Sequence, residues 1–262
     1  MHSTGYTLRF IIILTAVVAL VLTALREVTK DQSDKNEEIF NKKEILKAIA
    51  PKLGPDGGAA VVKDFNDQKV EEIFDSKIKQ LAINKAGEVV DKEAIVSAGY
   101  RGGKAIDIDM AKEKKKPEDQ RMFPLFIYGT GKDAVYIMNV RGSGLWDEIW
   151  GNVAVKSNYS TIVGVSFDHK GETPGLGAEI KDNPAFPRSF EGKELYNDEG
   201  EFVSVTVRKG GARDKEHEVD GISGATVTAD GVTEMLERGI SYYQPYFEKQ
   251  EAGSLQGYLI NK

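Results

Sequence analysis

The sequence predicts an α+β protein in which a single N-terminal transmembrane helix precedes a soluble domain with a mainly antiparallel sheet packed by helices. Three observations support this class. One segment, Phe10 to Leu25, is apolar and carries no charge. Apolar residues at helical spacing follow it, and beyond about residue 95 the spacing changes to the period of two that is typical of strands. We therefore expect an anchor at 1–30, a helical region at 31–94 and a ligand-binding domain at 95–262.

The apolar segment is long enough to form a membrane anchor. A helix over about residues 8–26, at about 1.5 Å per residue, covers most of a roughly 30 Å hydrocarbon layer. Tyr6, Arg9 and Arg26 stand at its ends, where their polar groups can reach the interfaces. The alternative is a cleaved signal peptide, which would need a more positive leader and a small residue where Leu22 stands. We expect a retained, single-pass anchor.

Flanking charges leave the orientation of this anchor open. Arg26, Lys30 and Lys35 follow the segment, and they compete with Arg9 and the amino terminus before it. The signal-like shape of the leader favours a soluble domain on the outer side of the membrane.

Composition excludes several kinds of site. The chain has no Cys, which rules out disulfides, thiolate zinc sites, iron–sulfur ligation and cysteine catalysis. Its three His are too few for a histidine-rich metal site, although a carboxylate-only cation site stays open. A net charge of -6 and a pI near 5.3 have the wrong sign for a nucleic-acid-binding protein.

Two helices and five strands are expected between the anchor and a last helix. The helical spacing occurs at Ile39, Phe40, Ile45, Leu46 and Ile49, and again at Val70, Ile73, Phe74, Ile78 and Leu81, with Pro51 and the 54–58 cluster between them. The strand-like runs are Phe123 to Tyr128, Ala134 to Val140, Asn152 to Lys156, Thr161 to Phe167 and Phe202 to Arg208. The segment 129–133 predicts a hairpin loop, and Val227 to about Glu248 predicts the last helix. Lys112 to Arg121 carries both charges and is interpreted as a solvated loop.

Small residues ahead of the last helix form the first of three functional candidates. Asp220 to Thr226 reads DGISGAT, and small residues there leave backbone N–H groups at a helix N-terminus open to an anion. The alternative is structural, because Ser223 and Thr226 are both good helix N-caps. The spacing fits neither a phosphate-binding P-loop nor a dinucleotide fingerprint.

Two further glycine-rich segments carry bulky apolar residues. Gly171 to Glu179 reads GETPGLGAE, and Leu176 on this loop suits a flat apolar ligand, or else tucks back into the core. Arg141 to Trp146 reads RGSGLW at the end of a strand, where glycine allows close approach and Trp146 offers a broad face. Singly, this segment is also consistent with a sheet edge packed on the core.

Together the three motifs, in this order and behind one membrane helix, resemble the C subunit of the sodium-translocating NADH:quinone reductase. The resemblance covers essentially the whole chain and makes 95–262 an FMN-binding domain. It implies that Thr226 carries FMN covalently through a phosphoester, attached by a separate flavin transferase. Ser223, Gly224 and Ala225 would then surround the phosphate.

The same resemblance suggests where the flavin ring lies and what the chain does. Leu145, Trp146, Thr173, Gly175 and Leu176 are the candidates for the surroundings of the ring, and Arg208 or Lys209 for a positive charge. The implied function is a translocase subunit that relays electrons from NADH toward quinone, coupled to sodium export. It implies a place in the cell inner membrane, with the flavin domain on the periplasmic side and other membrane subunits as partners. We do not expect the chain to be active alone.

Three other functions stay open at this stage. The flavin subunit of the related ferredoxin:NAD electron-transport complex shares the second and third motifs. A membrane-tethered binding module without a cofactor would use the three loops as a partner surface. An independent flavin oxidoreductase is disfavoured, because the sequence has no convincing catalytic His and no motif for a pyridine nucleotide.

Overall fold

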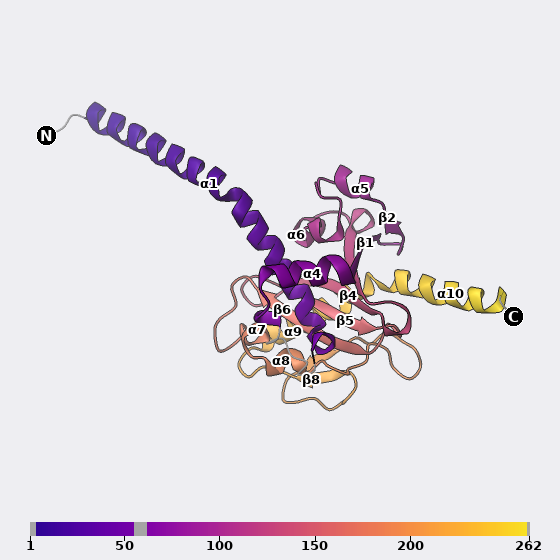
Figure 1. Ribbon diagram of the computed structural model, residues 1–262. Coiled ribbons are helices and arrows are strands. Elements are labelled where there is room, and N and C mark those ends of the chain that lie inside the picture. The colour runs from indigo at the N-terminus through magenta and orange to yellow at the C-terminus, as the bar shows by residue number, and fades with distance from the viewer. Residues whose placement is uncertain (1–3, 55–61, 261–262) are drawn as a thin grey trace. The chain divides into compact units, whose positions relative to one another are not determined.

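A computed structural model describes residues 4–54 and 62–260 of the chain (Figure 1). Residues 55–58, part of the expected break between two helices, lie outside the described residues. The chain divides into two compact units, Met1–Asn41 and Lys42–Lys262.

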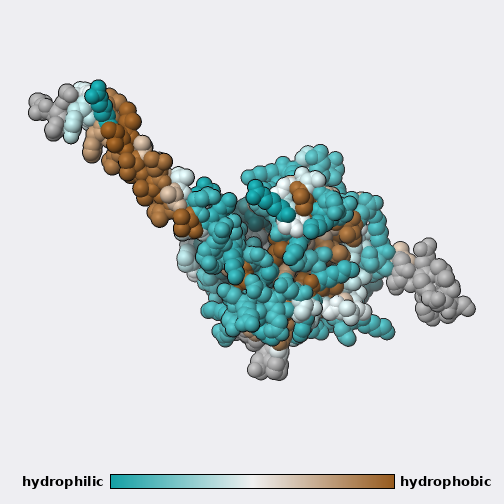
Figure 2. Space-filling model, turned by 45° about the horizontal axis from the view of Figure 1, so that its top comes forward, coloured by the Kyte–Doolittle hydropathy of each residue, from teal (hydrophilic) through white to brown (hydrophobic). Residues whose placement is uncertain are grey.

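The first unit is formed by the N-terminal part of a long helix, α1, which runs from Thr4 to Ala48. Between Tyr6 and Ala48 the sequence contains no Gly or Pro that would break a helix. The apolar side chains from Phe10 to Leu25 are exposed, and Figure 2 shows them as a continuous hydrophobic surface. By length and composition, α1 can cross a membrane.

A six-stranded antiparallel sheet forms the centre of the second unit, within the part of the chain that the structure describes. Its strand order is β2-β1-β3-β4-β5-β6. The strands are β1 (Ile78–Asn84), β2 (Val89–Val90), β3 (Met122–Tyr128), β4 (Val135–Ser143), β5 (Glu148–Lys156) and β6 (Ile162–His169). The hairpin between β3 and β4 is confirmed at the expected loop. Together with α1, this sheet confirms the predicted fold class.

Side chains of the sheet are buried on both faces because they alternate along each strand. In β4, Met138 and Val140 point into one hydrophobic cluster, which also contains Met235 and Leu236. Ile137 points into the other cluster, beside apolar residues from 45–50 and from the helix at 67–77. Helices therefore cover both faces of the sheet.

These covering helices are mostly short. They are α2 (Ala50–Leu53), α4 (Asp67–Lys77), α5 (Lys92–Ser97), α6 (Met110–Glu113), α7 (Glu179–Asp182), α8 (Ala185–Arg188), α9 (Thr226–Ser241) and α10 (Gln244–Ile260). Three 3₁₀ turns are η1 (Ala105–Asp107), η2 (Glu118–Gln120) and η3 (Gly131–Asp133). The strands β7 (Thr206–Arg208) and β8 (Glu218–Asp220) form a separate parallel pair. Of these elements, α9 packs along β4.

The region expected to be helical contains two strands. The helix α4 ends at Lys77, and Ile78 and Leu81, which were expected to continue it, lie in β1. From Ile78 to Asn84 this segment pairs residue by residue with β3. Cross-strand pairing therefore overrides the helical spacing, and the sheet begins well before residue 95.

Two other expected elements are shorter than the pattern indicated. The strand expected over 202–208 is regular only at β7, because Ser204 has a φ of 58° and breaks the alternation of buried residues. The last helix divides at Tyr242–Tyr243 into α9 and α10. Pro245 has no N–H to continue a helix, and the hydroxyl of buried Tyr243 donates to the Pro124 carbonyl at 3.0 Å.

The charged stretch 112–121 is partly buried rather than fully solvated. Glu113 is fully buried, and its carboxylate accepts hydrogen bonds from the Tyr100 hydroxyl at 2.5 Å, Lys116 Nζ at 2.6 Å and the Met122 N–H at 2.8 Å. These bonds satisfy the buried charge and fix the segment against β3.

Candidate functional site

Three loops supply the candidate site, and each follows from a break in a regular element. The first is the turn between β4 and β5, closed by a hydrogen bond from the Gly144 N–H to the Asp147 carbonyl at 2.8 Å. A Cβ at Gly144 would collide with Glu172 Oε1, so only glycine allows this approach. The turn leaves Leu145 and Trp146 exposed, at 52% and 68%.

The second loop follows β6 and holds the Thr-Pro-Gly-Leu segment. The N–H groups of Leu176 and Ala178 both donate to the Thr173 carbonyl at 3.1 Å. Gly175 has a φ of 73°, and Leu176 points outward with 41% of its surface exposed. Leu176 therefore does not tuck into the core, which was the alternative for this residue.

The third loop leads into α9. Gly224 has a φ of 77°, a region that glycine adopts without strain. Ser223 is exposed, Ala225 is buried, and Thr226 is the partly exposed first residue of α9. The Ala225 N–H, expected to face an anion, donates instead to the Ile222 carbonyl at 3.2 Å.

The N-terminus of α9 has no side-chain cap among the described residues. Ala225 is the N-cap residue, so neither Ser223 nor Thr226 acts as the cap that sequence reasoning held open. The positive end of the helix dipole and its first N–H groups therefore favour an anion at this turn. A phosphate beside Thr226 would meet that preference.

Glu172 joins the three loops. It is 5% exposed, and its Oε1 accepts a hydrogen bond from the Trp146 N–H at 3.0 Å. Its Oε2 accepts one from the Thr228 hydroxyl, in the first turn of α9, at 2.6 Å. One buried carboxylate thus fixes the first loop and the helix that begins with Thr226 against the second loop.

Further contacts bring the exposed apolar residues close to Thr226. Trp146 Nε1 donates to the Thr173 hydroxyl at 3.0 Å. A Cβ on Gly224, two residues before Thr226, would lie 2.8 Å from Leu176 Cδ2. The structure therefore places Trp146, Thr173 and Leu176 around the turn that leads to Thr226.

Positive charge beside this turn comes from β7 and the residue after it. Arg208 binds Glu218 through Nε at 2.9 Å and through Nη2, so its charge is engaged. This pairing, with N–H groups from Arg213 and Asp214, lowers the pKa of Glu218 to about 2. Lys209 is exposed and lines an open cavity of about 460 Å³, together with Asp230 of α9. Of the two cations expected, Lys209 is the better candidate.

Sequence reasoning missed Glu172 and Thr228 as parts of the site. Both stand inside the motifs, but their roles depend on a contact between residues 56 positions apart. The available signal was an acidic residue inside an otherwise small and apolar loop. Such a carboxylate is rarely buried without hydrogen-bond donors.

A flat ligand with a phosphate fits the residues present. Leu145, Trp146 and Leu176 offer exposed apolar surface, and the uncapped start of α9 offers a place for an anion. The Thr226 hydroxyl stands at that start and is partly exposed. A sheet packed by helices and a site of this kind define the class of FMN-binding domains, and a family model described as "FMN-binding domain" matches residues 144–241.

Similar proteins agree on one family. The C subunit of the Na(+)-translocating NADH-quinone reductase of Haemophilus ducreyi is 29% identical over 262 residues, which cover 95% of both chains. The protein of the same name from Vibrio anguillarum is 32% identical over 71% of this chain and 76% of its own length. A crystal structure of the same protein from Parabacteroides distasonis superimposes with a TM-score of 0.67 at 33% identity, and covers 83% of this chain and 96% of its own. The chain belongs to this family, the C subunits of Na(+)-translocating NADH-quinone reductases.

Proposed function

We propose that this chain is a membrane-anchored flavoprotein subunit of a Na(+)-translocating NADH:quinone reductase, with FMN bound covalently to Thr226. The observation that carries the proposal is the position of the Thr226 hydroxyl. It stands at the uncapped start of α9, beside three exposed apolar side chains from two other loops. Family membership and the match to an FMN-binding domain support the choice of ligand.

The linkage to Thr226 is a phosphoester. The threonine oxygen replaces one phosphate oxygen of FMN, which leaves a diester with a single negative charge. The N-terminus of α9 stabilises that charge, and the exposed Ser223 and Lys209 lie on the adjoining loops. A separate flavin transferase is the partner that forms the bond.

The protein contributes position and surroundings, while the bound FMN supplies the electron transfer. Leu145, Trp146, Thr173, Gly175 and Leu176 form the apolar and polar border of the ring. Because these residues are exposed, the ring edge stays accessible to a redox partner. We propose other membrane subunits of the same complex as those partners.

The place of the chain in the cell follows from α1. Its apolar part forms a single membrane span in the cell inner membrane, and the flavin domain lies on the periplasmic side. The complex relays electrons from NADH toward quinone, coupled to sodium export. This assignment is favoured over the ferredoxin:NAD complex by the names of the relatives.

In-gel fluorescence of the denatured full-length chain tests the proposal. The chain is expressed together with a flavin transferase, and Thr226→Ser is the conservative control. We expect a fluorescent band in the wild type, because a covalent flavin survives denaturation, and a weaker band in Thr226→Ser, which keeps a hydroxyl. A band without fluorescence in the presence of an active transferase contradicts the proposal and favours the cofactor-free binding module.

A further inference from the structure

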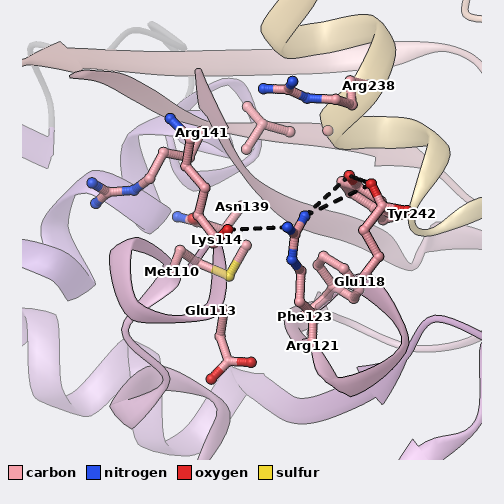
Figure 3. Close-up of a pocket in the computed structure, with 12 residues that line it drawn as sticks. Met110, Glu113, Lys114, Glu118, Arg121, Phe123, Asn139, Arg141, Arg238 and Tyr242 are labelled. Atoms are coloured by element: carbon pink, nitrogen blue, oxygen red, sulfur yellow. Dashed lines mark hydrogen bonds and ion pairs between the residues drawn. The ribbon is translucent and has the colours of Figure 1, made fainter. Parts of the chain in front are cut away.

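We propose that a cavity at the other end of α9 binds a small organic carboxylate. The cavity has a volume of about 200 Å³ and lies between α9, β4 and the segment 110–121 (Figure 3). It is below the roughly 300–1,000 Å³ typical of pockets for drug-sized ligands, so its occupant is small. We call it the Arg121 cavity, after the side chain at its centre.

Its lining is rich in positive charge. Four cationic side chains line it, namely Lys114, Arg121, Arg141 and Arg238. The two carboxylates in the lining are already engaged: Glu113 by Lys116 at 2.6 Å, and Glu118 by Lys85 at 2.7 Å. Outside the lining, Glu148 and Glu234 pair with three of the cations. The group as a whole keeps a positive excess in a chain whose net charge is -6. An anion is therefore the favoured occupant.

Arg141 carries an unsatisfied donor. Its Nη1 binds Glu148 at 2.6 Å, and its guanidinium lies 5.1 Å from the centre of the Trp150 ring. Its Nε is nevertheless buried without a partner, and Ser204 Oγ is the one other such side-chain atom in the described ranges. A buried charged donor without an acceptor is unfavourable. An oxygen of a bound carboxylate would supply the acceptor.

Arg121 is held in place before any ligand arrives. Its Nε donates to the Lys116 carbonyl at 2.9 Å and its Nη2 to the Lys114 carbonyl at 3.0 Å. Its Nη1 donates to the Tyr242 hydroxyl at 3.3 Å. Figure 3 shows this guanidinium between Lys114 and Tyr242. A guanidinium fixed by its neighbours binds an anion with little loss of side-chain entropy.

Apolar side chains favour an organic anion over a simple ion. Phe123 and Tyr242 stack with their ring centres 4.6 Å apart, and they line the cavity together with Met110 and Val140. A short hydrocarbon or aromatic part can contact these groups while its carboxylate meets the cations. Guanidinium groups match the planar geometry of a carboxylate well.

The Arg121 cavity is separate from the candidate flavin site. Arg238 is twelve residues after Thr226 on the same helix, about 18 Å at about 1.5 Å per residue. Leu145, Trp146, Thr173, Leu176 and Thr226 are absent from its lining, which consists of described residues. Binding is therefore measurable in a chain with or without a flavin.

The test is a ligand titration of the full-length chain in detergent micelles. Butyrate, benzoate and succinate are titrated at constant ionic strength and followed by saturation-transfer NMR, with butyramide and benzamide as neutral counterparts and inorganic phosphate as the simple anion. We expect saturable binding of at least one carboxylate with a Kd below about 10 mM. Its neutral counterpart and phosphate should bind at least about tenfold more weakly, which is about 1.4 kcal/mol.

Two variants with the same charge change locate the binding. Arg238→Gln removes a partly exposed cation from the lining, and Arg188→Gln removes an exposed one from α8. We expect Arg238→Gln to weaken carboxylate binding severalfold and Arg188→Gln to leave it unchanged, with both variants unfolding at the wild-type temperature. No saturable binding of any carboxylate overturns the proposal. So does equal binding of the amides or of phosphate, or equal weakening by both variants.

Discussion

Glu172 is the residue on which the geometry of the candidate site depends most. Its two carboxylate oxygens hold the Trp146 N–H and the Thr228 hydroxyl, which belong to two separate segments. A buried carboxylate in this position replaces water for both donors and also lies at the favourable end of α9. Removing it leaves both donors without an acceptor.

Replacing Glu172 should therefore destabilise the chain in proportion to the bonds lost. We expect Glu172→Ala to lower the free energy of unfolding by about 2–4 kcal/mol, and Glu172→Gln, which keeps an acceptor for Trp146, by about 1 kcal/mol. Urea unfolding followed by tryptophan fluorescence measures both. Glu199→Ala removes an exposed carboxylate as a control. A Glu172→Ala variant as stable as Glu199→Ala contradicts this role.

Gly224 offers a second test at the level of one residue, because the chain contains a matched glycine. Gly224 and Gly192 have φ values of 77° and 78°, but a Cβ would approach Leu176 at Gly224 and meets open space at Gly192. Alanine at either position should cost about 1 kcal/mol of stability.

Of these two variants, only Gly224→Ala should reduce the flavin content, because it displaces Leu176 beside Thr226. Flavin absorbance per chain after co-expression with the transferase gives the measurement. An equal loss of flavin in Gly192→Ala would mean that the contact with Leu176 is irrelevant and that backbone strain alone is responsible.

At the scale of elements, sequence patterns predicted what depends on local spacing. The sheet strands β3 to β6, the hairpin at 129–133 and the start of α9 were all expected from apolar alternation and small residues. They missed β1, because Ile78 and Leu81 continue the helical spacing of α4 and their strand pairing depends on β3, about 40 residues away. For the same reason the spacing predicted the three motif loops but not the carboxylate that joins them.

The parallel pair of β7 and β8 should respond to acid. Arg208 and neighbouring N–H groups lower the pKa of Glu218 to about 2, against about 4.3 in an unfolded chain. A carboxyl with a lowered pKa in the folded state contributes stability above about pH 4, and this contribution is lost as the pH falls toward about 2.

Stability measured against pH checks this contribution. We expect the wild type to be more stable than Glu218→Gln near neutral pH, and the difference should narrow as the pH falls from about 4 toward about 2. Urea unfolding at a series of pH values gives the two curves, with Glu199→Gln as a control for the loss of an exposed carboxyl. Curves that stay parallel through this range would show that the Arg208–Glu218 pair does not set the pKa.

At the scale of the whole molecule, the two units have different tasks. The apolar part of α1 anchors the chain, and the second unit presents three loops around Thr226. Such a chain positions one redox group and depends on partner subunits for its electrons. Among the described residues no cluster of three or more His, Asp or Glu is placed to hold a metal ion.

The flavin-loaded chain by itself should not turn over NADH. We expect NADH oxidation no faster than with an equal concentration of free FMN, because the sequence carries no motif for a pyridine nucleotide. NADH absorbance over time gives the rate, and the Thr226→Ala chain provides the background. Sustained NADH turnover above the free-FMN rate would contradict the relay and identify an independent oxidoreductase.

Mass spectrometry of the full-length chain, produced with a flavin transferase, tests the central claim most directly. We expect the intact mass to rise by one FMN less one water, with the added mass on the peptide that contains Thr226. Thr226→Ala should abolish this gain, while Ser223→Ala, which removes an exposed hydroxyl from the same turn, should keep it. An unmodified wild type beside an active transferase, or a gain that persists in Thr226→Ala, would contradict the account.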